Sequence, residues 1–169
     1  MKTLVAVAAS MALLSMGFQS CQSLRMSRVS CLSALSDSTV TKVVGDSLGY
    51  ILADPDRVTV SRKGADGELT LSKGSVETLR FLMANPANYA SDRPVYGVFT
   101  PSLTYRFYGI KGRQLNVCCD FSLRKFSLVD ADGKQIGRYD MADDELLRFS
   151  LGIYPDDSFL NLILQSRQK

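Results

Sequence analysis

Residues 93–139 carry the sequence RPVYGVFTPSLTYRFYGIKGRQLNVCCDFSLRKFSLVDADGKQIGRY. Apolar residues recur in it at about every second position, which is the period of a half-buried β-strand. Turn-forming Pro, Gly and Asp-Gly separate five such runs: RPVYGVF, LTYRFYGI, QLNVCCDF, KFSLV and QIGRY. The stretch therefore predicts an antiparallel meander, with Asp132-Gly133 as a tight hairpin turn.

The same alternation assigns the faces of one strand. Leu115, Val117, Cys119 and Phe121 fall on one side of the third run, while Cys118 falls on the other. We expect the first group to be buried together in the core.

The segments around the meander predict helices and a hairpin. Residues 38–52 place Val, Leu and Ile on one helical stripe, although the β-branched residues of 39–44 also suit a strand. We predict an α+β fold, with an antiparallel meander sheet of about five to six strands and flanking helices, as a single domain over 38–169. The other expected elements are strands at 57–63 and 68–71, and helices at 72–84, 142–154 and 159–164.

The first twenty residues have the pattern of a secretory signal. Lys2 is their only charge, an uncharged apolar run extends from Leu4 to Phe18, and Ser20 stands directly before Cys21. The run is shorter than the roughly 20 apolar residues that cross a bilayer. We therefore expect residues 1–20 to be removed as a signal peptide.

Phe18-Gln19-Ser20-Cys21 resembles the relaxed lipobox of lipoproteins from the Bacteroidota, in which Ser often precedes the Cys. The remaining layout, with a helix ending in Asn85-Pro86 and a meander containing Thr-Pro-Ser-Leu-Thr-Tyr-Arg-Phe, looks like small envelope lipoproteins of that group. The resemblance implies lipidation of Cys21, a tether over 21–37 and an outer-membrane position facing the periplasm. Plain secretion to the periplasm is the alternative. The resemblance implies no activity.

Charge and size restrict the class of partner. Removing residues 1–20 leaves 149 residues, a usual size for one domain. That part has 19 basic residues, because Lys2 is lost from the 20, and 17 acidic residues, so its net charge is 19 minus 17, or +2. The two signs are interspersed, whereas a nucleic-acid binder concentrates basic residues on one face. We expect a membrane partner through the anchor, an envelope protein or glycan partner, and no nucleic acid.

The chain has no His, which excludes Ser-His and Cys-His nucleophile pairs and His-ligated zinc. Asp130-Ala131-Asp132-Gly133 has Gly at its fourth position and Met141 at its twelfth, so it fits a hairpin turn better than a calcium loop. The acids at 143–145 and 156–157 suit helix N-termini better than a catalytic pair. We therefore expect no catalytic residue, no metal and no cofactor.

Three thiols remain besides Cys21. Reduced structural thiols, a disulfide between Cys31 and Cys118, and a strained disulfide between Cys118 and Cys119 are the alternatives. A catalytic or metal-binding thiol has no supporting motif, because no CxxC spacing is present.

Aromatic residues gather in the first two runs of the meander. Tyr105 and Phe107 should point into the core, while Tyr96 and Tyr108 lie on the opposite faces of their strands and form a candidate binding surface. The alternative is that the helices cover one sheet face and these tyrosines only line the other. The functional hypothesis is a membrane-anchored binding or structural module. The alternatives are an inhibitor of an envelope hydrolase and an enzyme that uses carboxylates or Cys118.

Overall fold

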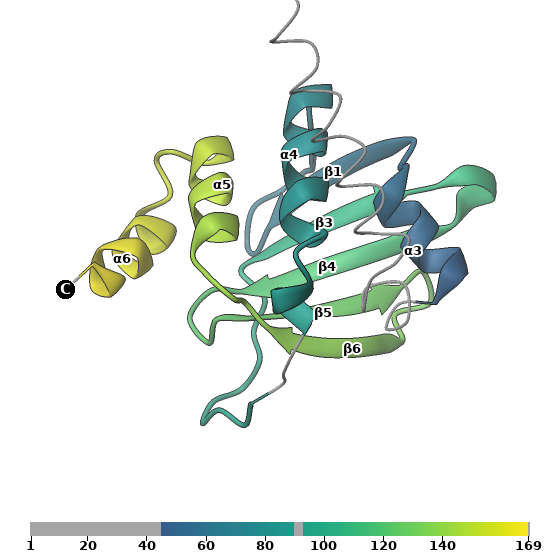
Figure 1. Cartoon of the computed structure of the whole chain (residues 1–169). Coiled ribbons are helices and arrows are strands. Elements are labelled where there is room, and N and C mark those ends of the chain that lie inside the picture. The colour runs from purple at the N-terminus through teal and green to yellow at the C-terminus, as the bar shows by residue number, and fades with distance from the viewer. Residues whose placement is uncertain (1–44, 90–92, 169) are drawn as a thin grey trace, which may run out of the picture.

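Six antiparallel strands form an open sheet, and the helices lie on one of its faces (Figure 1). This arrangement belongs to a computed structural model, which describes residues 45–89 and 93–168. It confirms the predicted α+β class, the antiparallel sheet and the single domain. The expected signal peptide (1–20) and tether (21–37) lie outside the described residues.

The sheet joins an early hairpin to the later meander. Its order is β2-β1-β3-β4-β5-β6, so that β1 pairs with β3 although about forty residues separate them. The hairpin strands and the last four runs of the alternating stretch are therefore one sheet. The strands are β1 (Arg57–Arg62), β2 (Leu69–Thr70), β3 (Leu103–Tyr108), β4 (Gln114–Asp120), β5 (Lys125–Asp130) and β6 (Gln135–Asp140).

The first expected run of the meander, RPVYGVF, is wrong as a strand. Residues 93–102, which we call the projecting segment, contain no strand. Pro94 and Pro101 lack the N–H that a sheet ladder needs, and Gly97 has a φ of 148°. The segment instead binds side chains at the ends of β4 and β6, as described below.

Helices cover the inner face of the sheet, and their N-caps follow from the sequence. The Ser72 side chain accepts a hydrogen bond from Ser75 N at 3.2 Å, and Asp157 accepts two bonds at the last helix. The Asn85-Pro86 pair ends the second helix, as predicted. The helices are α3 (Asp46–Ala53), α4 (Lys73–Met83), η1 (Pro86–Tyr89), η2 (Ile110–Gly112), α5 (Glu145–Ile153) and α6 (Ser158–Arg167).

The helix expected over 38–52 begins later than predicted. Gly45 is the N-cap of α3 and has a φ of 77°, a left-handed conformation that interrupts a continuous helix. Residues 38–44, including the alternative strand over 39–44, lie outside the described residues.

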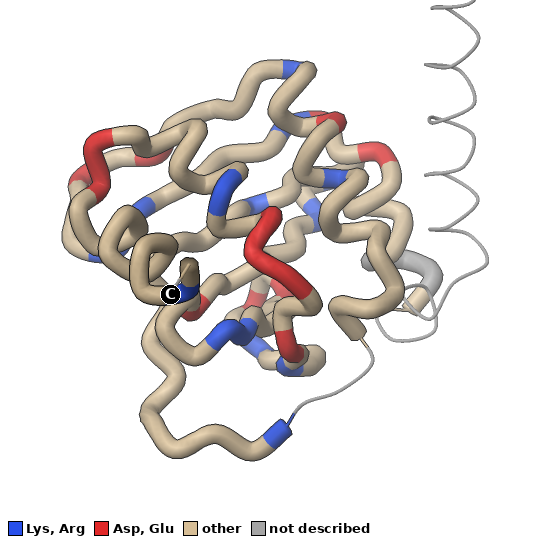
Figure 2. Tube along the Cα trace, turned by 60° about the vertical axis from the view of Figure 1, so that its left-hand side comes forward, with Lys and Arg blue, Asp and Glu red and all other residues tan. Residues whose placement is uncertain are grey.

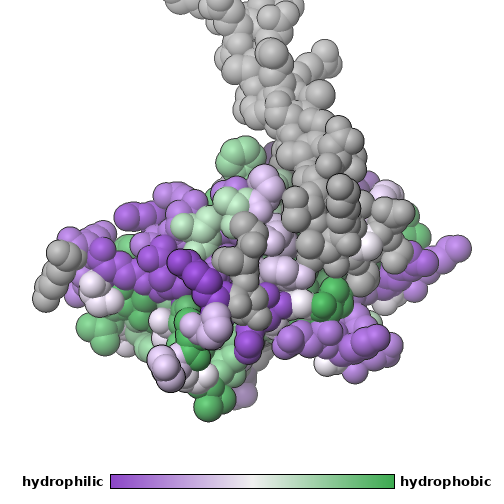
Figure 3. Space-filling view, turned by 60° about the horizontal axis from the view of Figure 1, so that its bottom comes forward, coloured by the Kyte–Doolittle hydropathy of each residue, from purple (hydrophilic) through white to green (hydrophobic). Residues whose placement is uncertain are grey.

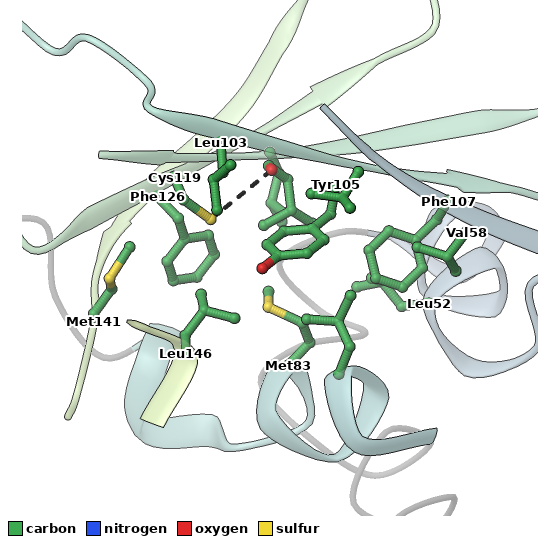
Figure 4. Close-up of a cluster of buried hydrophobic side chains, with 14 of the residues drawn as sticks. Leu52, Val58, Met83, Leu103, Tyr105, Phe107, Cys119, Phe126, Met141 and Leu146 are labelled. Atoms are coloured by element: carbon green, nitrogen blue, oxygen red, sulfur yellow. Dashed lines mark hydrogen bonds between the residues drawn. The ribbon is translucent and has the colours of Figure 1, made fainter. Parts of the chain in front are cut away.

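The core lies between the sheet and these helices (Figure 4). Leu115, Val117, Cys119 and Phe121 are all fully buried, which confirms the face assigned to this strand. Tyr105 and Phe107 are also fully buried, as predicted. The helices contribute Leu52, Met83 and Leu146 to the same cluster. Fully burying each such side chain stabilises the fold by about 1.5–3 kcal/mol.

The turn between β5 and β6 is the predicted hairpin rather than a calcium loop. Asp130 Oδ1 accepts hydrogen bonds from Asp132 N at 3.0 Å and Lys134 N at 2.8 Å. Gly133 has a φ of 81°, which a glycine adopts without strain. The Asp130 carboxylate is therefore used within its own turn.

Candidate functional site: the open face of the sheet

The second face of the sheet carries polar side chains that point away from the helices. Strand alternation places them there, because the residues next to them in each strand point to the core side. The described helices leave this face uncovered, although Thr59 and Ser127 on it are themselves buried (Figure 1). We call it the open face, formed by Arg57, Thr59, Ser61, Thr104, Arg106, Tyr108, Gln114, Asn116, Cys118, Ser127 and Arg138.

Glu68 organises one side of the open face. It precedes β2, and its carboxylate accepts hydrogen bonds from Thr59 Oγ1 at 2.7 Å and Arg106 Nη1 at 2.5 Å. The same Arg106 nitrogen donates to Ser61 Oγ at 2.9 Å. These bonds fix the Arg106 side chain across β1 and β3, so its guanidinium is held in place before any partner binds.

Tyr108 lies on the open face, as the sequence predicted. The Arg57 guanidinium carbon stands 4.3 Å from its ring centroid, which is a cation–π contact. One face of the ring is thus occupied. Beside it, Gln114 Nε2 donates to Asn116 Oδ1 at 2.6 Å.

Tyr96 is not brought together with Tyr108. It belongs to the projecting segment, which is bound at the Leu103 end of β3, whereas Tyr108 is at the other end. The two ends of β3 are five residue steps apart, which corresponds to about 16 Å. The two tyrosines therefore do not form the single aromatic surface that the sequence suggested.

Three buried charged side chains form a row across the sheet, near the Leu103 end of β3. Asp120 pairs in register with Lys125, and Lys125 pairs in register with Asp140, so all three share one face. Lys125 is only 1% exposed, and its Nζ lies 2.7 Å from Asp140 Oδ1. We call these residues the ionic row. Sequence reasoning missed it, because strand register alone brings the three together.

The projecting segment closes over the ionic row. Arg93 Nε donates to Asp140 Oδ2 at 2.9 Å, and Thr100 N donates to Asp120 Oδ2 at 2.7 Å. Asp120 Oδ1 also accepts from Leu123 N at 3.1 Å. Both ends of the segment are therefore fixed to carboxylates of the row, which explains why it does not pair as a strand.

The thiols are not arranged for catalysis. Cys118 and Cys119 are both free, so the strained disulfide between them is wrong; Cys31 lies outside the described residues. Burial raises the pKa of the Cys118 thiol, although the Thr104 hydroxyl at 3.8 Å and Arg106 act in the opposite sense. A reactive cysteine needs a lowered pKa. The direction at Cys118 is the reverse of what a nucleophile requires.

The acids at the helix N-termini serve as caps and ion-pair partners. Asp157 is buried, caps α6 and lies 2.9 Å from Arg62 Nε. Asp144 pairs with Arg167 and, at 3.6 Å, with Arg124. Asp144 and Asp157 are therefore both used in ion pairs within the fold.

A hollow of about 20 Å³ beside α4 and α5, lined by Met83, Asn88 and Met141 among others, would hold little more than a water molecule. Within 45–89 and 93–168, no three His, Cys, Asp or Glu side chains are grouped as metal ligands. In the same ranges, no helix is long and apolar enough to span a membrane.

Comparisons with protein families, with curated proteins and with solved structures return no match to this chain.

Proposed function

We propose that the protein is a lipid-anchored envelope protein, held at the outer membrane through Cys21, whose domain binds an envelope protein through the open face. The binding role rests on one observation: a sheet whose second face is polar, organised by hydrogen bonds and left uncovered by the described helices. The address is supported by the lipobox-like Phe18-Gln19-Ser20-Cys21.

The charges of the open face indicate the chemistry of the partner. Arg57 and Arg106 carry two positive charges, while Glu68 supplies one negative charge beside them. A net positive surface suits a partner surface that carries carboxylates, because complementary charge raises the association rate and fixes orientation. The Arg57 contact on Tyr108 occupies a ring face that a sugar would need for stacking, which favours a protein over a glycan. An envelope hydrolase inhibited by this domain would be one such protein.

The anchor is tested by processing in the native host. Globomycin blocks the peptidase that cleaves lipoprotein signals, so the full-length precursor should accumulate in its presence. Unchanged processing with the drug would contradict the lipoprotein assignment and leave plain secretion.

The open face is tested by a photo-crosslinking residue placed at Gln114, with a matched probe at the exposed Lys73 on the helix side. We expect one protein adduct from position 114 and none of the same mass from position 73. The added change Arg57→Glu should weaken the adduct at 114, because it reverses a charge at the rim of the face. Equal adducts from both positions, or none from either, would contradict the assignment of the open face.

A further inference from the structure

The projecting segment exposes apolar side chains that a soluble surface does not require. Tyr96 is fully exposed, Val98 is 86% exposed and Val95 is also exposed. Figure 3 brings this end of the molecule forward and shows hydrophobic groups at its lower left, beside hydrophilic ones. Three neighbouring exposed apolar residues on one loop tip indicate a contact with an apolar environment.

The segment is held outward rather than folded onto the domain. Arg93 and Thr100 fix its two ends to Asp140 and Asp120. Between them, Gly97 packs against Leu123, where an added Cβ would meet the Leu123 side chain at 3.0 Å. Its tip is therefore supported at three places, and its apolar side chains are presented without a large ordering cost at the moment of contact.

Charge at the base of the segment complements an anionic bilayer. Residues 94–102 contain no charged side chain (Figure 2). Arg93 is 79% exposed, and Arg124, on the turn that follows β4, is 47% exposed. Among the described acids near the base, Asp120 and Asp140 are buried in the ionic row, and Asp144 lies 3.6 Å from Arg124. Asp92 directly precedes Arg93 in the sequence. An uncharged Val-Tyr-Val tip above exposed guanidinium groups has the composition of an interfacial membrane contact, with Tyr at the headgroup level and Arg near the phosphates.

We propose that the projecting segment is a second membrane contact, in which Val95, Tyr96 and Val98 enter the headgroup boundary of an anionic bilayer. The proposal rests on the proposed lipid anchor for its location. Twenty-four residue steps separate Cys21 from Gly45, since 45 minus 21 is 24, and at full extension these reach at most about 80 Å. The anchor therefore permits this end of the domain to face the bilayer. One acyl anchor and one interfacial tip together would orient the sheet on the membrane.

The absence of Trp from the sequence allows a direct measurement. Tyr96→Trp places a single fluorophore at the tip, and Phe81→Trp places one at an exposed position of α4 as the matched control. Each full-length lipidated protein is reconstituted into vesicles of phosphatidylethanolamine and phosphatidylglycerol, with or without brominated acyl chains. We expect Trp emission at position 96 to shift to shorter wavelength and to be quenched by bromine, and emission at position 81 to do neither.

A second variant separates the tip from the anchor. The unlipidated Cys21→Ser chain with Tyr96→Ser and Val98→Ser should partition into the same vesicles about tenfold or more weakly than Cys21→Ser alone, because it loses two apolar side chains from the contact. Absence of quenching at position 96 would overturn the membrane contact in favour of a protein contact, and so would equal quenching at 81 and 96. Acyl label on Cys21 is scored on the same samples. A labelled protein with no quenching refutes only this inference, whereas missing label refutes the anchor.

Discussion

Replacing Lys125 by Met should destabilise the fold more than any exposed charge substitution. Met keeps most of the aliphatic volume but removes the cation that lies 2.7 Å from Asp140 Oδ1 and pairs in register with Asp120. Removing one partner of a buried ion pair typically costs about 3–5 kcal/mol, because the other charge stays buried without compensation. Because Arg93 still binds Asp140 Oδ2, we expect the loss of unfolding free energy to be at the lower end of this range, about 3 kcal/mol.

The assay is urea unfolding of the full-length chain, followed by far-ultraviolet circular dichroism. For a small domain the slope is about 1–3 kcal/mol per molar urea, so the midpoint should fall by about 1 M or more. The matched control is Arg148→Met, which breaks an exposed pair with Glu145 at 3.9 Å and should cost at most about 1 kcal/mol.

A double substitution sharpens the test of the ionic row. Adding Asp140→Asn to Lys125→Met removes the stranded carboxylate charge, so the double variant should be more stable than the sum of the two single losses predicts. A Lys125→Met protein within about 1 kcal/mol of wild type would refute the reasoning, since a buried lysine that pairs with carboxylates cannot be removed so cheaply.

Three further predictions concern the core and the thiols. Phe107→Ala should lower the free energy of unfolding by about 3–5 kcal/mol in the same urea assay, because the side chain is fully buried; a loss under about 1 kcal/mol would contradict the packing. Ser150→Ala should cost more than Tyr105→Phe, because the first leaves the buried Tyr105 hydroxyl without its 2.7 Å partner, whereas Ser150 keeps its bond to a backbone carbonyl in the second; the reverse order in unfolding free energy would refute it. Native-state alkylation should modify Cys118 slowly, with a rate that rises only above the usual thiol range of pH, and should spare Cys119; fast labelling of either at neutral pH would contradict the burial that raises both pKa values.

Side-chain alternation was sufficient to predict four strands and the faces of two of them, β3 and β4. In β3 and β4 the core positions recur every second residue, and a one-residue slip in register would expose the whole apolar set, so the sequence specifies them strongly. The buried Leu115 and Val117 follow directly from this rule.

The same rule failed at residues 93–99, where apolar residues also alternate. Two backbone features disfavour a strand here, because Pro94 has no N–H to donate and Gly97 has a positive φ. In addition, Arg93 and Thr100 bind carboxylates rather than a neighbouring strand. The bracketing prolines and the internal glycine were a signal in the sequence that this run is a loop.

The open face was predictable only in part. The position of Tyr108 followed from alternation, but its contact with Arg57 depends on the pairing of β1 with β3 across a long connection. The ionic row likewise requires the register of three strands, since Asp120, Lys125 and Asp140 are separated in sequence. Non-local register of this kind is not contained in any local pattern.

The intact mass of the mature protein purified from envelope membranes tests the central claim most directly. We predict a chain that begins at Cys21 and carries the added mass of a diacylglyceryl group, and loss of that form in Cys21→Ser. An unmodified chain, or a mature N-terminus at another residue, would contradict the lipid anchor on which the proposed function depends.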